Sequence, residues 1–152
     1  GLKEEDRDVF LELDYTGFIP DTYITAPSVK FDVYRRIAGI RTEAELEAFT
    51  GELADKYGPI PEEVANLLYI AEIKILCRKL SIVHLTERQG TVTLEFGRVA
   101  DVNPQKVIAL IKQSGKSVWY DQRRGNFLFM KTDKVSLKDK ALFLLEKLER
   151  LR

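Results

Sequence analysis

The sequence predicts one mixed α/β domain, of the α+β kind, because three features of its pattern occur together. The chain has 152 residues, 45% of them hydrophobic and 32% charged, which is enough to bury one sizeable core. Apolar residues recur every three or four positions through most of the first half and again at the end, which is typical of helices. Between these stretches lie two pairs of short, alternating segments joined by turn residues, the pattern of two β-hairpins.

The chain begins with a polar segment, a strand and a first helix. Residues 1–8 show no periodicity, so we expect a linker or chain end there, with residues 9–152 forming the domain. Residues 9–14 alternate as a strand does. Ser28 can cap a helix that ends at Gly39. The buried stripe predicted for this helix comprises Phe31, Tyr34, Ile37 and Ala38.

Two further helices follow. Thr42 and Glu45 form the T-x-x-E capping pattern at the start of the second helix, which a Gly-Pro dipeptide ends. Its predicted buried face comprises Leu46, Phe49, Leu53 and Tyr57. Pro61 fits the first position of a third helix that runs to about Leu80 and is apolar on more than one side. We therefore expect the third helix to be central.

The second half changes from helical to alternating periodicity. Turn residues QG and RRGN each separate two strand-like segments, and Asn103 and Ser136 are predicted helix caps, the latter together with Asp139. The predicted elements are strands 82–88 and 91–99, a helix between Asn103 and Gly115, strands 116–122 and 126–132, and a helix over 137–152. The order in which the strands pair does not follow from this pattern.

Charge is balanced overall but segregated along the chain. The 24 basic and 24 acidic residues cancel, so no global field favours nucleic acid or an anionic membrane. The charged residues among 43–63 are mostly acidic, whereas those of the later part are mostly basic, and such a surface suits docking to a protein partner.

A single cysteine, Cys77, indicates a reducing compartment, so we expect a cytoplasmic chain. The apolar runs are too short for a membrane span.

Catalysis is not predicted. The single histidine, His84, lies within a candidate strand, and Cys77 lies in an apolar helical stretch that is typical of a core. One Cys and one His cannot alone form a structural zinc site, and no phosphate-binding glycine motif occurs, so we expect neither metal nor cofactor. Glu52 with Asp55 can hold Mg²⁺ or act as acid and base only with further ligands or a pocket.

A nucleic-acid interface is the alternative function. Arg123 and Arg124 lie between strands that carry four aromatic residues: Trp119, Tyr120, Phe127 and Phe129. Aromatic and basic side chains on one sheet face can stack bases and pair phosphates. The other interpretation is that the alternate aromatics pack in the core while the arginines occupy a solvated turn.

The acidic pair Glu52 and Asp55 is the strongest candidate for a binding site. Both lie near the end of the second helix, where the helix dipole disfavours carboxylates, and both project opposite the buried face. Ala48 and Gly51 leave room for close approach, so two arginines of a partner can reach both carboxylates. The alternative is a solvated helix face with a local contact to Lys56.

Several motifs in order resemble one family. The run ELADKYG, residues 52–58, followed by Pro61, resembles the E-L-x-D-[RK]-[FY]-G-x-x-P signature of the C-terminal domain of bacterial transcription-repair coupling factor, Mfd. Further matches are Pro20 with Tyr23 and Ile24 (P-x-x-Y-I), residues 34–38 (YRRIA), 42–46 (TEAEL), Leu80 with Ile82 (L-x-I) and 102–104 (VNP). The resemblance extends from about Leu11 and thins after Pro104.

The resemblance implies a non-catalytic regulatory module of a larger, ATP-dependent DNA translocase that displaces stalled RNA polymerase and recruits UvrA. It implies docking on a UvrB-like module of the same chain, which covers the UvrA-binding surface and restrains the motor. Glu52 and Asp55 match the family's acidic docking positions. ATP, Mg²⁺ and the contacts with DNA and RNA polymerase belong to the rest of the full-length protein. We expect the isolated domain to be a monomer.

Overall fold

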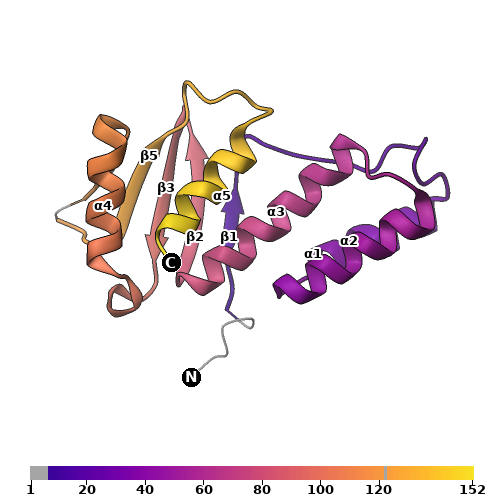
Figure 1. Cartoon of the computed structure of the whole chain (residues 1–152), viewed down its shortest axis with the longest axis horizontal. Coiled ribbons are helices and arrows are strands. Elements are labelled where there is room, and N and C mark those ends of the chain that lie inside the picture. The colour runs from indigo at the N-terminus through magenta and orange to yellow at the C-terminus, as the bar shows by residue number, and fades with distance from the viewer. Residues whose placement is uncertain (1–6, 122) are drawn as a thin grey trace.

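The computed structural model describes residues 7–121 and 123–152, in which helices cover one face of a sheet (Figure 1). Most of the predicted linker, residues 1–6, lies outside the described residues. Helices occur where the sequence predicts them: in the first half, between the two hairpins and at the end. This order confirms the mixed α/β class. In chain order the elements are β1 (Phe10–Glu12), α1 (Pro27–Ala38), α2 (Glu43–Tyr57), α3 (Glu62–Lys79), β2 (Ile82–Arg88), β3 (Thr91–Phe96), η2 (Val99–Asp101), α4 (Pro104–Ser114), η3 (Gly115–Ser117), β4 (Val118–Tyr120), β5 (Phe127–Lys131) and α5 (Lys140–Arg150).

The sheet has the strand order β1-β2-β3-β5-β4. β1 runs parallel to β2, with Phe10 beside His84, and helices α1 to α3 form the connection between these two strands. Both predicted hairpins are present as the antiparallel pairs β2–β3 and β4–β5. β3 also pairs with β5, so the two hairpins form one continuous sheet.

The two hairpins turn differently. Gln89 and Gly90 have φ angles of 50° and 75°, as a two-residue type I′ turn requires, and a Cβ on Gly90 would lie 2.8 Å from the Cβ of Asp133. The strands of the second hairpin are shorter than predicted. The turn η3 occupies the start of the predicted strand, and Asp121 Oδ1 accepts hydrogen bonds from the Arg123 and Arg124 amides, which forms a wider loop.

Two helices begin at other residues than predicted. α1 begins at Pro27, whose fixed φ suits a first helical turn, and the Ser28 side chain does not cap it. α5 begins at Lys140 rather than at residue 137. Its predicted capping pair does form, since the Ser136 hydroxyl donates to Asp139 Oδ2 and accepts from the Asp139 amide, but it closes a separate turn before the helix.

The buried stripe of α1 also differs from the prediction. Val33 and Ile37 are buried, and of the predicted stripe only Ile37 is among them. The other predicted members, Phe31, Tyr34 and Ala38, are exposed. The Tyr34 hydroxyl accepts a hydrogen bond of 2.7 Å from the Ile19 amide, which holds this ring at the edge of the helix. Apolar spacing alone could not distinguish the two stripes.

α2 and α3 follow their predictions closely. Thr42 caps α2, and its hydroxyl accepts a hydrogen bond of 3.2 Å from the Glu45 amide. Phe49 and Leu53 are buried on the inner face of α2. Pro61 directly precedes α3 as its N-cap rather than occupying the first helical position. The two helices are therefore specified largely by local signals.

α3 is the element that joins two hydrophobic clusters. One cluster lies between the covered face of the sheet and the helices α3, α4 and α5, and α3 supplies Ile73, Leu76 and Cys77 to it. The other lies among α1, α2 and α3, to which α3 supplies Val64, Leu68, Ala71 and Ile75. This arrangement confirms the central place predicted for α3. None of the helices in residues 7–121 and 123–152 covers the opposite face of the sheet (Figure 1).

A buried ion pair links the sheet to α5. Lys140 Nζ lies 3.0 Å from Glu87 Oε2, and the two side chains are 9% and 1% exposed. The Thr132 hydroxyl donates to the same oxygen, and the Asp14 amide donates to Glu87 Oε1 at 3.0 Å. Lys140 also donates to the Asp14 carbonyl at 3.1 Å. Both carboxylate oxygens of Glu87 and the ammonium group of Lys140 have hydrogen-bond partners, so this network is a structural link rather than a reactive site.

Candidate partner-binding site

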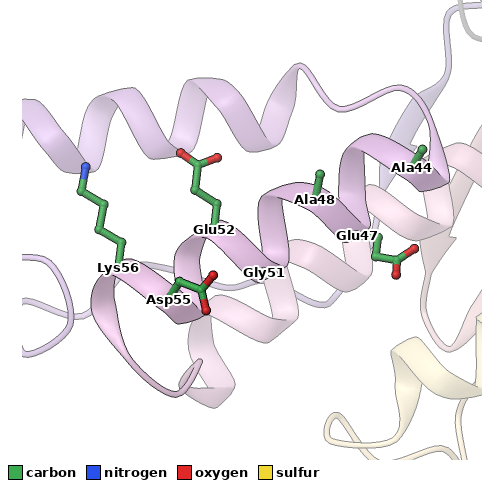
Figure 2. A pocket seen from close by; sticks show the side chains of 7 residues that line it. All are labelled: Ala44, Glu47, Ala48, Gly51, Glu52, Asp55 and Lys56. Atoms are coloured by element: carbon green, nitrogen blue, oxygen red, sulfur yellow. The ribbon is translucent and has the colours of Figure 1, made fainter.

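The outer face of α2 carries a shallow, open hollow (Figure 2). Phe49 and Leu53 pack into the cluster beneath the helix, which fixes the opposite positions in solvent. The hollow is lined by Ala44, Glu47, Ala48, Gly51, Glu52, Asp55 and Lys56. Both acidic residues predicted as partner-binding therefore belong to one continuous surface.

Small side chains leave the α2 backbone accessible in this hollow. Ala44 and Ala48 are exposed, and no atom lies within 4 Å of the place where a Cβ on Gly51 would be. A long side chain at any of these positions would stand between the helix and an approaching surface. The hollow therefore permits the close approach that the sequence predicted.

Glu52 is held by an arginine of the neighbouring helix, a contact that sequence reasoning missed. Its two carboxylate oxygens accept hydrogen bonds from the Arg36 guanidinium at 2.8 and 2.7 Å. These hydrogen bonds lower the pKa of Glu52 from its ordinary value, and the positive charges of Arg36 and Lys56 act in the same direction. Lys56, the contact considered from the sequence, has its Nζ 5.5 Å from the centre of the Tyr57 ring instead.

Asp55 differs from Glu52 in having no such partner. It is exposed, and within residues 7–121 and 123–152 it forms neither a hydrogen bond nor an ion pair through its side chain. Figure 2 shows Glu52 and Lys56 extending towards α1, whereas Asp55 and Glu47 point away from it. The two predicted carboxylates thus flank the hollow on different sides rather than pointing together, and Asp55 is the one available to a partner.

The second set of predicted residues lies at the sheet, far from α2. Arg123 and Arg124 are exposed in the β4–β5 loop, where Arg124 Nε lies 3.1 Å from Asp121 Oδ2. The interpretation that alternate aromatics of these strands pack in the core is wrong, although the two arginines do lie in an exposed turn, as that interpretation also held. Val118, Leu128 and Met130 fill the core, while Trp119, Phe127 and Phe129 lie on the uncovered face of the sheet.

The residues considered for catalysis do not come together. Cys77 is fully buried, which raises its pKa to about 12. His84 lies on the uncovered face of the sheet, with Nδ1 3.2 Å from Glu95 Oε1. Among the described residues no group of three or more His, Cys, Asp or Glu is placed to hold a metal ion, and no helix is long and apolar enough to cross a membrane.

Comparison with known proteins places this geometry in a family. A family model described as the TRCF domain matches residues 13–107, which is more than half of the chain. The chain belongs to the TRCF domain family. The matched part of this TRCF domain begins directly after β1 and ends within α4. It includes the α2 hollow with Glu52 and Asp55 and excludes Arg123 and Arg124.

Relatives of this TRCF domain are named transcription-repair-coupling factor. The protein of Borreliella burgdorferi is 26% identical over 99% of this chain, and that of Rickettsia prowazekii is 35% identical over 68%. The matched regions are 13% and 9% of those proteins, so the chain spans only a small part of their length. A solved C-terminal domain of transcription-repair coupling factor superposes with a TM-score of 0.81, at 23% identity, covering 95% of this chain and 92% of the other, which shows the same fold.

Proposed function

We propose that this TRCF domain is a non-catalytic, autoinhibitory interaction domain that docks on the UvrB-like module of its full-length chain. Docking masks the UvrA-binding surface of that module and restrains the DNA translocase motor until RNA polymerase is engaged. The observation that carries the proposal is the α2 hollow, where Asp55 offers a carboxylate with no partner among the described residues. The role needs no cofactor on this chain and operates in the cytoplasm.

The chemistry of the hollow selects arginine as its partner. Guanidinium groups bind carboxylates through two parallel hydrogen bonds, and the accessible backbone at Gly51 lets a partner surface approach closely enough to form them. Asp55 is free to accept both bonds. Glu52 already accepts one hydrogen bond on each oxygen from Arg36, but each oxygen has a second lone pair, so it can share a further donor.

The strength of such contacts suits a lock that must open. Desolvated charge pairs at protein interfaces contribute on the order of a few kcal/mol each when they are favourable. Moving a two-state equilibrium from 1:99 to 99:1 requires about 5.5 kcal/mol of differential binding. One or two arginine–carboxylate contacts therefore bias the domain towards docking while leaving polymerase engagement able to release it.

The decisive experiment is calorimetric titration of the chain against the UvrB-like module of the same full-length protein. We expect the wild-type chain to bind and the Glu52→Ala, Asp55→Ala double variant to lose about 30-fold in affinity or more. Of the single variants, Asp55→Ala should lose more than Glu52→Ala, because only Glu52 is already held within the chain.

A matched control removes the same charge elsewhere. Glu146 and Glu149 are exposed on α5, each with a side chain 58% exposed, and changing both to alanine should leave docking unaltered. Circular dichroism checks that every variant is folded. Equal affinity of the α2 double variant and the wild type would refute the docking site, and equal losses in both double variants would indicate only a general effect of charge.

A further inference from the structure

The face of the sheet opposite the helices carries aromatic and polar side chains, and no helix in the described part of the chain covers it. Strand alternation sends Leu85, Leu94 and Leu128 into the core, so the neighbouring positions of each strand point to the other side. A shallow groove on this side is lined by Phe10, His84, Thr86, Thr93, Glu95 and Phe127. The face crosses all five strands, a width of about 19 Å at the usual strand spacing.

Three rings form a stack at the β5–β4 end of this face. Trp119 and Phe129 are cross-strand partners whose ring centres lie 5.5 Å apart with planes inclined by 15°. Phe127, two residues before Phe129, lies 6.5 Å from it at 17°. Trp119 is 37% exposed, and both phenylalanines are partly exposed. These near-parallel rings form a row, here called the platform, whose members stay partly exposed.

Positive charge borders the platform. Arg124 lies over the Phe127 ring, 4.5 Å from its centre, and Lys131 is exposed on the same side of β5 as Phe127 with no ion pair among the described residues. Residues 116–134 contain five basic and two acidic residues, although the whole chain is neutral. Acidic groups lie close by as well. Glu95 is the cross-strand partner of Phe127, and its carboxylate lies 3.2 Å from His84 Nδ1. Asp121 pairs with Arg124 at 3.1 Å, and Glu12, at the β1 edge, lies 3.5 Å from Arg88.

We propose that this face binds single-stranded nucleic acid. Unpaired bases stack against the exposed parts of this row of rings, of which Trp119 is the most exposed, and the neighbouring phosphates contact Lys131 and Arg124. A duplex keeps its bases stacked on one another, so only a single strand can use the rings. The charge complementarity favours a polyanion over a neutral protein surface, since the rings lie in the basic part of the chain.

This activity is separate from the proposed docking. The sheet and the α1–α2 pair lie at opposite ends of the long axis of the molecule, with α3 between them (Figure 1). A ligand on the sheet therefore does not need the α2 hollow, and failure of either proposal leaves the other standing. The site residues at the β5–β4 end also lie outside the part of the chain that matches the family model.

The single tryptophan of the chain provides a direct probe, because Trp119 is itself part of the platform. Titration with a 12-nucleotide oligothymidylate, which has no tryptophan fluorescence, should quench Trp119 emission, and fluorescein anisotropy of the same oligonucleotide gives the affinity. The logarithm of the association constant should fall linearly with the logarithm of the salt concentration. A duplex of equal length and matched salt serves as the competitor and should bind more weakly.

Two variants at the face and two elsewhere complete the test. Phe127→Ala should weaken binding by roughly 5- to 150-fold, the range for one stacked base, and Lys131→Glu should weaken it and reduce the salt slope by about one. The matched controls, Phe31→Ala on α1 and Lys138→Glu before α5, should bind as wild type does. Three results would overturn the proposal: no quenching with the wild type, tighter binding of the duplex, or equal losses in the face and control variants. It would also be overturned if the chain bound no oligonucleotide but self-associated, and Phe127→Ala abolished that self-association.

Discussion

Substitutions of Gly51 should change the stability of the domain and its proposed docking independently of each other. This glycine lies inside α2 on the exposed side, and a Cβ there would meet no atom within 4 Å. Glycine in a helix interior is less favourable than alanine by about 0.8–1 kcal/mol. Gly51→Ala should therefore raise the free energy of unfolding by about 0.5–1 kcal/mol, with an increase in Tm of roughly 2–4 °C for each kcal/mol.

Urea denaturation followed by circular dichroism measures this change, and Gly17→Ala provides the opposite control. A Cβ on Gly17 would lie 2.4 Å from the Glu63 carbonyl oxygen and 2.9 Å from the Leu67 amide nitrogen, so that variant should lose about 1–3 kcal/mol. If Gly51→Ala destabilised the domain instead, the argument that nothing within the chain requires glycine at this position would be wrong.

A larger side chain at the same position tests docking. Glutamine has a higher helix propensity than glycine, so Gly51→Gln should not destabilise α2. The long side chain of this variant fills the hollow between Ala48 and Asp55. We expect its affinity for the UvrB-like module to fall at least about tenfold, which corresponds to about 1.4 kcal/mol. Docking as tight as that of the wild type would show that the partner approaches another surface.

Three further changes test other contacts. Arg36→Ala frees Glu52, so docking in the calorimetric assay should be unchanged or tighter, and a tenfold loss would mean that Arg36 itself contacts the partner. Lys140→Met leaves Glu87 buried without its cation and should cost about 3–5 kcal/mol in urea denaturation, part of which Glu87→Gln in the same chain restores; an unchanged midpoint would contradict the buried pair. Cys77, with its pKa raised to about 12, should resist a thiol-specific disulfide reagent at pH 8 until denaturant exposes it, and prompt labelling of the folded chain would refute its burial.

Local signals made α2 predictable, whereas contacts between distant residues did not appear in the sequence. The Thr42 cap, the apolar period and the following glycine lie within a few residues of each other and agree on one helix. Arg36 and Glu52 are 16 positions apart, and only the packing of α1 against α2 brings them together. The pairing of β3 with β5 is likewise a long-range contact, so no pattern in the sequence specified it.

The aromatic face shows a different limit of sequence reasoning. Alternation indicates which residues of a strand share a side, but in the strand containing Phe127 and Leu128 both sides are apolar. Hydrophobicity then cannot decide which set faces the core. The helices above the sheet accommodate the aliphatic side chains, and the larger rings are left outside. A strand can be apolar on both sides although helices cover only one of them. Such a strand therefore indicates a binding surface on its other side.

The helix dipole bears differently on the two acidic residues of the α2 hollow. The negative end of α2 disfavours carboxylates, most strongly within the last turn. Arg36 offsets this effect at Glu52 within the chain, so the presence of Glu52 has a structural explanation that requires no partner. Asp55 lies closer to the end of the helix and has no compensating cation among the described residues. Of the two predicted docking residues, Asp55 is thus the one whose charge stability alone does not explain, and for that reason its single substitution is the sharper test of function.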